Sequence, residues 1–215
     1  MVLIFDMDGV IVDNHKWHFK AWKEFGRRHG LNITKNAFSN FFGSTNLVSM
    51  NSLFGNELTI TQIDALSNEK EAIYRELYYP HIKPVKGLPD FLQYASERSI
   101  PIALATSAPS ENIKFTLEGT GLKDFFTVVT DSSMVSHGKP DPEVYTITAE
   151  KLGVQPIECI VFEDSVPGIL SAQNAGMRVI GIATTHKSDK LLMYVNEIIM
   201  NFEAAYNLID NKLQA

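Results

Sequence analysis

The sequence has one cysteine, no long apolar run and no excess of positive charge, and each absence excludes a class of protein. The single Cys159 can form neither a disulfide framework nor a zinc site within the chain, and its apolar neighbours indicate a small buried residue. No apolar run approaches the roughly 20 residues that span a bilayer. The formal net charge is −6 and the Lys and Arg residues show no stripe, so nucleic acid is not an expected partner.

The first residues are apolar for only a few positions, and Asp6 and Asp8 follow at once. A secretory signal would have a basic start and a longer apolar stretch, so we expect a cytoplasmic protein with no membrane partner. With 215 residues, 45% of them hydrophobic, the chain can bury one good core and a small second unit. We expect a monomer.

Five short runs are apolar throughout rather than alternating, which is typical of strands covered on both faces. Helical patterns separate the later runs, and this alternation predicts a parallel sheet with right-handed crossovers. The predicted fold class is α/β, a Rossmann-like parallel sheet with helices on both faces. The predicted strands are residues 2–5, 102–105, 126–129, 159–162 and 179–182, and the predicted helices between them are 90–98, 110–118, 142–152 and 165–175.

The segment 14–83 breaks the alternation, because it is helical by pattern and has no convincing strand. Thr61 and Asp64 resemble a capping box and predict the start of a helix there. The apolar residues expected on the inner side of this helix are Ile63, Leu66, Ile73 and Leu77. We interpret 14–83 as a helical domain inserted after the first strand, with 1–13 and 84–215 forming the core domain. A last amphipathic helix is expected after about residue 202, with Phe202, Ala205, Tyr206 and Ile209 on one side.

Asp6 and Asp8 follow the first predicted strand, at the edge where open parallel sheets bind ligands. Two carboxylates there repel each other and lose hydration, and a divalent cation such as Mg²⁺, which prefers oxygen ligands, removes that difficulty. Asp6 can attack a phosphorus atom as a nucleophile. Asp8 is close enough to protonate the leaving oxygen and then to activate water. Gly9 allows a tight turn away from the site.

Hydroxyl groups and a cation follow at later positions. Thr106, after the second predicted strand, can donate a hydrogen bond to a phosphoryl oxygen or serve as a helix cap or turn residue, and Ser107 adds a second hydroxyl. Lys139 lies in a loop that Gly138 and two prolines stiffen. Lys139 can neutralise a phosphoryl group and the nearby nucleophile, and the alternative is a solvated loop lysine.

Glu163 and Asp164 follow the fourth predicted strand and repeat the electrostatic problem of the first pair. One shared cation would relieve the repulsion in both pairs. We therefore expect Asp164 to be the firmer metal ligand, directly or through water, with Glu163 beside it. Ser165 is expected to cap the next helix.

Together these motifs resemble the haloacid dehalogenase superfamily of phosphotransferases, and within it the beta-phosphoglucomutase-like group of sugar-phosphate phosphatases and mutases. The resemblance covers nearly the whole chain and rests on residues 5–13, 105–107, 138–142 and 162–165 with Gly168. It implies that Asp6 is the nucleophile and Asp8 the general acid/base, and that Asp6, the Asp8 carbonyl and Asp164 hold Mg²⁺. It also implies that Thr106 and Lys139 bind the transferring phosphate. A dehalogenase lacks the second Asp, so Asp8 argues against that branch.

The resemblance further implies that the helical insert is a cap that closes over the site, excludes water and selects the substrate. His18 corresponds to a histidine that contacts the general acid, and the alternative is an ordinary packed or exposed histidine. Trp22 is expected in the core. Lys70 corresponds to a lysine that contacts the sugar, and the alternative is a solvated lysine. Asn46 ends the stretch 42–46, where the mutases carry an arginine for the second phosphate; this stretch has none, which weakens the mutase interpretation.

The sequence thus predicts a Mg²⁺-dependent phosphatase that hydrolyses a small phosphorylated metabolite, with a sugar phosphate as the expected class, through an aspartyl-phosphate. Beta-phosphoglucomutase activity is the second hypothesis, because the same intermediate can be attacked by a sugar instead of water. A third hypothesis is a non-catalytic binding protein on the same scaffold. That hypothesis predicts the loss of active-site residues, and this chain retains them.

Overall fold

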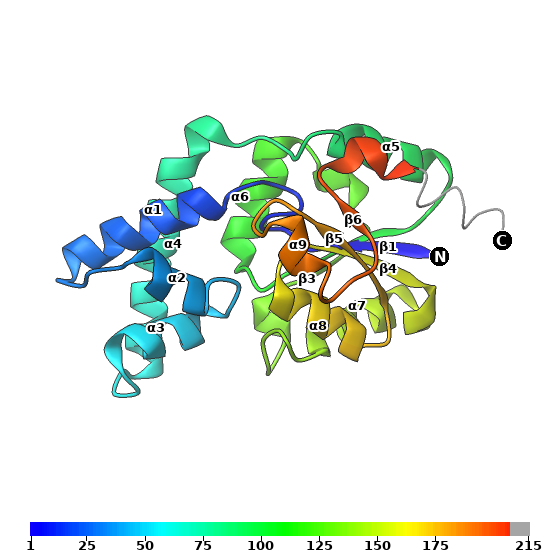
Figure 1. The fold of residues 1–215 in the computed structure, drawn as a ribbon. Coiled ribbons are helices and arrows are strands. Elements are labelled where there is room, and N and C mark those ends of the chain that lie inside the picture. Colours follow the sequence, from blue (N-terminus) through cyan, green and yellow to red (C-terminus); the bar gives the residue numbers. More distant parts are fainter. Residues whose placement is uncertain (207–215) are drawn as a thin grey trace. The chain divides into compact units, whose positions relative to one another are not determined.

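The computed structural model describes residues 1–206, and the chain divides into two compact units. Met1–Asp13 and Lys83–Ala215 make up the first unit, and Asn14–Ile82 makes up the second (Figure 1). A helix was expected after residue 202, and the structure has the 3-10 turn Phe202–Ala204 there. Of the residues expected on its inner side, Phe202 and Ala205 are buried, Tyr206 meets Phe91 and Tyr94 edge-on, and Ile209 lies outside the described residues. None of the helices within residues 1–206 is both long and apolar enough to cross a membrane.

The first unit is built on a six-stranded sheet in which every pairing is parallel, and this confirms the predicted fold class. The strand order is β3-β2-β1-β4-β5-β6. The strands are β1 (Val2–Phe5), β2 (Ile102–Ala105), β3 (Val128–Thr130), β4 (Cys159–Glu163), β5 (Arg178–Ile182) and β6 (Ile198–Ile199). In the central strand, Phe5 pairs with Leu104 of β2 and with Phe162 of β4. The residues that follow these three strands therefore lie next to one another.

β4 and β5 are each one residue longer than predicted, and two other strands differ more. β3 begins two residues later than expected, because the 3-10 turn Lys123–Phe125 ends at Phe126 and removes that residue from the ladder. β6 was not predicted, because a strand of two residues leaves no periodic pattern. Cys159 is buried at the start of β4, as expected of a small hydrophobic residue.

Helices cover both faces of the sheet (Figure 1). Val2 and Ile4 point to one face and pack in one core cluster with apolar residues of α7 and α8. On the other face, Phe5 stacks on Phe162 with ring centroids 4.8 Å apart, and Phe91 of α5 lies against both rings. Each fully buried ring of this kind stabilises the fold by roughly 1.5–3 kcal/mol. The helices of this unit are α5 (Leu88–Glu97), α6 (Ser110–Thr120), α7 (Glu143–Leu152), α8 (Val166–Asn174) and α9 (Ser188–Leu191).

The second unit is entirely helical within the described residues, as its sequence pattern predicts. Its elements are α1 (His15–Arg28), α2 (Lys35–Phe41), α3 (Asn46–Phe54), α4 (Ile60–Tyr78) and the 3-10 turn Tyr79–His81. Trp22 is buried and meets the rings of Phe41 and Phe25 edge-on, with centroid distances of 4.9 Å and 5.5 Å. The prediction that Trp22 belongs to the core of this unit is confirmed.

The predicted start and inner face of α4 need correction. The capping box is formed by Thr59 and Gln62 rather than Thr61 and Asp64, and the helix begins at Ile60. Thr59 has extended backbone angles, so its hydroxyl accepts the N–H of Gln62 and caps the helix two residues earlier than predicted. The buried face consists of Ile63, Ser67, Lys70, Glu71, Ile73, Tyr74 and Tyr78, whereas Leu66 and Leu77 are only partly buried.

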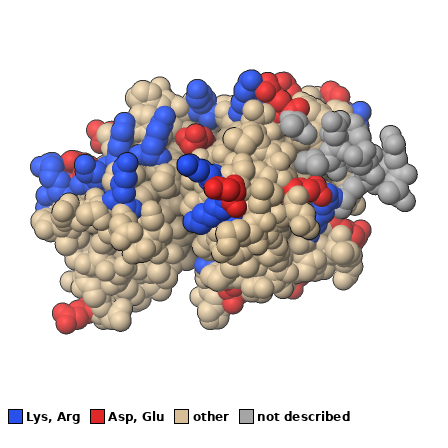
Figure 2. Space-filling model, in the orientation of Figure 1, with Lys and Arg blue, Asp and Glu red and all other residues tan. Residues whose placement is uncertain are grey.

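The basic residues of α1 also differ from the sequence interpretation. Exposed cations recur at alternating spacings of four and three residues, which places them on one side of the helix. These residues are Lys16, Lys20, Lys23 and Arg27. Figure 2 shows Lys and Arg side chains gathered over this helix. The statement that the basic residues form no stripe is therefore wrong, although Glu24 pairs with Arg27 at 2.9 Å and offsets part of the charge.

Candidate active site

Asp6 begins a tight turn directly after β1. Its N–H donates to the carbonyl of Phe162 at 3.1 Å, which fixes it beside the end of β4. The turn then closes on itself, with the N–H of Gly9 donating to the carbonyl of Val12 at 2.7 Å. Gly9 has a φ of +82°, and a Cβ atom there would overlap the carboxylate of Asp164. Glycine is therefore required both for the turn and for the close approach of Asp164.

Lys139 is buried and its ammonium group is surrounded by three oxygen partners. The Nζ atom lies 2.7 Å from Oδ1 of Asp6, 2.6 Å from Oε1 of Glu163 and 3.1 Å from the hydroxyl oxygen of Tyr145. Burial alone would lower the pKa of Lys139, but the charges of Asp6 and Glu163 raise it well above its usual value. Lys139 is therefore a fixed cation in direct contact with the predicted nucleophile. The alternative of a solvated loop lysine is wrong.

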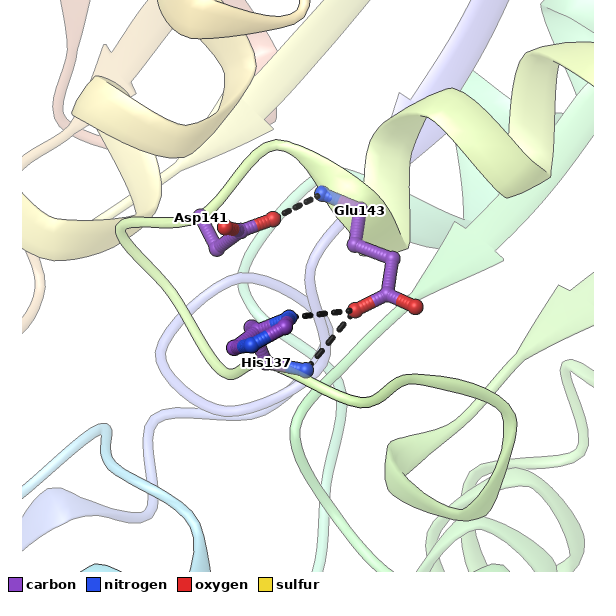
Figure 3. Close-up of side chains that lie close together, drawn as sticks. All are labelled: His137, Asp141 and Glu143. Carbon is purple, nitrogen blue, oxygen red and sulfur yellow. Dashed lines mark hydrogen bonds and ion pairs between the residues drawn. The ribbon is translucent and has the colours of Figure 1, made fainter.

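The loop that presents Lys139 is held by side chains at both of its ends (Figure 3). Oε2 of Glu143 accepts the backbone N–H groups of Ser136 at 2.8 Å and His137 at 2.7 Å. Oδ1 of Asp141 accepts the N–H of Glu143 at 3.0 Å, so α7 begins at Glu143, one residue later than predicted. The hydrogen bonds that the Glu143 carboxylate accepts from the N–H groups of Ser136 and His137 lower the pKa of Glu143. His137, Asp141 and Glu143 lie close together, and we interpret them as a brace for this loop.

We expect Glu143→Ala to lower kcat/KM by about threefold to tenfold, because the loop loses two hydrogen bonds to a charged acceptor and Lys139 is less well placed. Steady-state kinetics with a saturating divalent cation would measure the change. The matched control is Glu150→Ala, an exposed glutamate on the same helix. Equal activity of the two variants would show that the brace does not set the position of Lys139.

Glu163 is fully buried at the end of β4, and both of its carboxylate oxygens accept hydrogen bonds. Oε2 accepts from the backbone N–H groups of Asp164 and Ser165, both at 3.0 Å, while Oε1 accepts from Lys139. Ser165 also caps α8, as the sequence predicts. A Cβ atom at Gly168 would overlap this carboxylate, so the helix start can approach Glu163 only with glycine.

Three carboxylates meet at this edge of the sheet. One ligand oxygen from each of Asp6, Glu163 and Asp164 lies within 4.8 Å of the other two. Burial, partly opposed by Lys139 and reinforced by Glu163 and Asp8, raises the pKa of Asp6 to about 7. Burial, followed by the charges of Glu163 and Asp6, raises the pKa of Asp164 well above its usual value. Excess negative charge thus accumulates here, which is the environment that a divalent cation neutralises.

The donor atoms also suit a hard cation. Oδ2 of Asp164 is buried and has no hydrogen-bond partner among the described residues. A buried acceptor without a partner costs free energy unless a ligand or water satisfies it. The oxygens of Glu163, in contrast, are already engaged by Lys139 and by backbone N–H groups. Asp6 and Asp164 therefore have the better geometry for a metal, and the predicted participation of Glu163 stays a prediction.

Thr106 follows β2 in the position that the strand register places next to the Asp6 turn. Its N–H donates to the carbonyl of Thr130 at 3.0 Å, and its hydroxyl oxygen accepts the N–H of Ala108 at 3.1 Å. Thr106 does not cap α6, because that helix begins at Ser110 after Pro109, but its bond to Ala108 makes it a turn residue, as the alternative stated. The buried hydroxyl keeps its own proton as a donor. Ser107 is half-buried beside it, and its role in substrate binding stays a prediction.

Two residues that contribute hydrogen bonds to the site at this edge of the sheet were not identified from the sequence. Tyr145 of α7 looks like one member of an apolar helical stripe, yet its hydroxyl donates to Oε1 of Glu163 at 3.0 Å. Thr184, in the loop after β5, donates its hydroxyl to the carbonyl of Gly9 at 2.5 Å and so ties that loop to the Asp6 turn. The position of Thr184 just after a parallel strand was the available signal. No sequence signal marks the hydroxyl of Tyr145.

Two of the predicted substrate-binding residues of the helical unit, His18 and Lys70, lie in a buried polar cluster. Nζ of Lys70 lies 3.0 Å from Nδ1 of His18 and 2.8 Å from Oε1 of Glu71. The ring of His18 stacks on Tyr74 with centroids 3.8 Å apart. Lys70 is therefore not a solvated lysine, and His18 is packed. Asn46 is the first residue of α3 and does not join this cluster.

A model of a protein family described as haloacid dehalogenase-like hydrolase matches residues 3–182. The Thermotoga maritima protein named phosphorylated carbohydrates phosphatase is 30% identical over 202 residues, which cover 92% of each chain. Beta-phosphoglucomutase of Bacillus subtilis is 29% identical over 188 residues, covering 84% of this chain and 82% of its own.

Among solved structures, a family IA haloacid dehalogenase hydrolase from Entamoeba histolytica superposes with a TM-score of 0.86. It is 29% identical in sequence, and the alignment covers 94% of this chain and 93% of that one. The match to the family model extends from the first strand to the end of β5, and so it includes the carboxylates, the threonine and the lysine of the site, which are Asp6, Asp8, Thr106, Lys139, Glu163 and Asp164. The chain belongs to the haloacid dehalogenase-like hydrolase family.

Proposed function

We propose that this protein is a Mg²⁺-dependent phosphatase that hydrolyses a small phosphorylated metabolite, most simply a sugar phosphate, through an aspartyl-phosphate on Asp6. The observation that supports this best is the buried contact of 2.7 Å between Asp6 and Lys139 at the ends of the central strands. A nucleophilic carboxylate next to a fixed cation can receive a phosphoryl group whose negative charge is neutralised as it arrives. The family membership and the phosphatases among the relatives support the same proposal.

The proposed reaction has two steps. In the first, a carboxylate oxygen of Asp6 bonds to phosphorus while the bond to the leaving oxygen breaks, and Asp8 gives its proton to that oxygen. In the second, Asp8 takes a proton from water, the water oxygen bonds to phosphorus, and the bond to Asp6 breaks. Thr106 and Lys139 would hold the phosphoryl oxygens during both steps. The half-buried position of Asp8 in the Asp6 turn is compatible with proton exchange with the substrate.

Asp6 and Asp164, with the carbonyl of Asp8, are the proposed Mg²⁺ ligands. A bound Mg²⁺ would neutralise the nucleophile and the phosphoryl group at once, since this ion prefers carboxylates together with phosphate oxygens. Oδ2 of Asp164, which has no hydrogen-bond partner within residues 1–206, fits this assignment. Glu163 would instead fix Lys139, because its oxygens already accept from that lysine and from two backbone groups.

The metal-free protein should be less stable at pH about 8 than at pH about 5.5. The pKa of Asp6 rises from 3.8 to about 7 in the folded state, so the folded protein prefers the protonated carboxyl and loses stability as the pH rises through this interval. Thermal unfolding in a chelator at both pH values would measure the difference. Mg²⁺ should raise the unfolding temperature most at the higher pH, and Asp6→Asn should reduce the pH dependence. A metal-free protein that becomes more stable toward pH 8 would contradict the assignment.

We propose that the helical unit, residues 14–82, selects the substrate, with His18 and Lys70 as its polar contact residues. His18 and Lys70 lie 3.0 Å apart in a buried cluster that also contains Glu71, and a lysine beside an imidazole offers hydrogen-bonding groups to the hydroxyls of a sugar. No arginine occurs in residues 42–46, where a second phosphate would need a bidentate partner. The proposed substrates therefore carry a single phosphate.

A screen of phosphorylated metabolites, with Mg²⁺ and with a chelator, tests the proposed function by the release of inorganic phosphate. We expect Mg²⁺-dependent release from one or more sugar monophosphates. The result that would overturn the proposal is an absence of turnover on every compound of the screen and on a generic aryl phosphate. Retained turnover in the chelator would remove the metal from the proposal.

Mutase activity is the second candidate, because a beta-phosphoglucomutase is among the relatives. The deciding measurement uses beta-glucose 1-phosphate with a trace of glucose 1,6-bisphosphate and follows both glucose 6-phosphate and inorganic phosphate. We expect phosphate release to be the faster process. Faster formation of glucose 6-phosphate would replace the phosphatase proposal with the mutase.

A further inference from the structure

Tyr145 lies on α7 with its side chain completely buried, and its hydroxyl sits between the two charged groups that define the site. The hydroxyl oxygen accepts from Nζ of Lys139 at 3.1 Å, and the hydroxyl proton is donated to Oε1 of Glu163 at 3.0 Å. We propose that Tyr145 is a positioning residue for phosphoryl transfer, whose hydroxyl holds the Lys139 ammonium and keeps Glu163 turned toward that lysine. This inference rests on the proposed function.

The hydrogen-bond capacity of Lys139 supports a role in orientation. An ammonium group has three donors and no acceptor. In this structure the three donors meet Asp6, Glu163 and Tyr145, so the group is held from three directions. Two anchors are carboxylates and attract the ammonium from many angles, whereas the hydroxyl of Tyr145 is neutral and acts through the direction of its bond. Without it, the ammonium can turn about its own axis and shift between the two carboxylates.

The hydroxyl also acts on Glu163. Oε1 of Glu163 accepts from both Lys139 and Tyr145, while Oε2 is held by the N–H groups of Asp164 and Ser165. Both oxygens are therefore pinned, and the carboxylate cannot rotate toward the Asp6–Asp164 pair without giving up bonds. Tyr145 thus helps to make Glu163 a counter-ion of the lysine instead of a third metal ligand.

The packing of Tyr145 does not by itself require a hydroxyl group. The ring belongs to the apolar cluster that α7 and α8 form on the sheet, a cluster that also contains Val144 and Ile169. A phenylalanine would fill nearly the same volume and would spare the burial of a polar group. The hydroxyl therefore points to a requirement of the site, which Tyr145→Phe can test without creating a cavity.

The experiment is a double-mutant cycle with Tyr145→Phe and Lys139→Met, measured by Mg²⁺-dependent hydrolysis of an aryl phosphate. We expect Tyr145→Phe alone to lower kcat/KM by about threefold to tenfold, the effect of losing one buried hydrogen-bond partner. In the Lys139→Met background the same change should have no further effect, because there is no ammonium left to orient. The inhibition constant of inorganic phosphate should rise with Tyr145→Phe by a similar factor. Tyr194→Phe, a partly buried tyrosine in the same unit, is the matched control.

The measurements distinguish a failure of the positioning role of Tyr145 from a failure of the proposed function. If wild-type protein shows no Mg²⁺-dependent hydrolysis, the proposed function is wrong. If wild type is active and Tyr145→Phe matches it in kcat/KM and in phosphate inhibition, the positioning role is wrong. Equal factors in the presence and absence of Lys139 would also overturn it, because they would show that Tyr145 acts only through stability. Thermal unfolding of all four proteins confirms that each variant is folded under the assay conditions.

Discussion

Replacing Asp6 by Asn should abolish turnover, with kcat falling by about four orders of magnitude or more. An amide is nearly isosteric with the carboxylate but is a very poor nucleophile toward phosphorus, so the aspartyl-phosphate cannot form. The buried side chain would remain beside Lys139, and the fold should be kept because the change removes one charge from a crowded set of carboxylates. Hydrolysis of an aryl phosphate in the presence of Mg²⁺ measures the effect.

The control for Asp6→Asn is Asp124→Asn, which makes the same chemical change at an exposed position of the first unit. This variant should keep wild-type activity. Trapping of the intermediate by rapid acid quench adds a direct readout, because wild-type protein should retain phosphate covalently and Asp6→Asn should not. An Asp6→Asn protein that hydrolysed the aryl phosphate as fast as wild type would show that the nucleophile lies elsewhere.

The sequence pattern allowed the layout of the core to be predicted because parallel strands leave two clear signals. Residues 2–5 and 159–162 are apolar without alternation, which indicates strands buried on both faces. Acidic residues follow each run at once, and parallel strands end at one edge of a sheet. These two facts predict that Asp6 and Asp164 lie at the same edge of the sheet. The structure adds that β1 and β4 are neighbours, and one carboxylate oxygen of each residue lies within 4.8 Å of the other.

The hydrogen bonds around Lys139 could not be predicted in the same way. Whether Glu163 faces the metal or the lysine depends on the rotation of one side chain, and sequence spacing does not determine rotation. Tyr145 looks like part of an apolar stripe, and only the angle at which α7 crosses the sheet brings its hydroxyl to Glu163. The glycine at 168 had a recognisable place in the motif, but its close approach to the carboxylate depends on the tertiary fold.

In the helical unit, the burial of Lys70 could not be predicted from the sequence for a different reason. Lys70 falls on the buried stripe of α4 together with Ile63, Ser67 and Tyr74, whose spacing of three and four residues was visible in the sequence. A charged residue on such a stripe is normally assumed to be exposed, because burying an ammonium group is unfavourable unless it is paired. The pairing comes from Glu71, which is adjacent in sequence, and from His18 on another helix. The partner on the other helix could not be inferred from local periodicity.

Replacing Lys139 by Met should have the second largest effect, on activity and stability together. Met keeps the length of the side chain and removes the charge, so kcat should fall by roughly 10²–10³, the loss typical of removing a preorganised group that stabilises charge in the transition state. The buried carboxylates of Asp6 and Glu163 would lose their shared partner, and breaking a buried ion pair costs about 3–5 kcal/mol of folding free energy. Chemical denaturation of the metal-free protein measures this loss.

The stability effect of Lys139→Met should depend on pH, which separates it from a simple packing defect. Burial raises the pKa of Asp6 to about 7 even with Lys139 present, and removal of the cation, which lowers that pKa, moves it further upward. At low pH the folded variant can protonate the carboxyl and recover much of the lost stability, whereas at high pH it cannot. Lys114→Met, an exposed lysine on α6, should show neither the loss nor the pH dependence. If the destabilisation by Lys139→Met were the same at every pH, the lysine would be acting through its packing, and its charge would not be what holds the two carboxylates together.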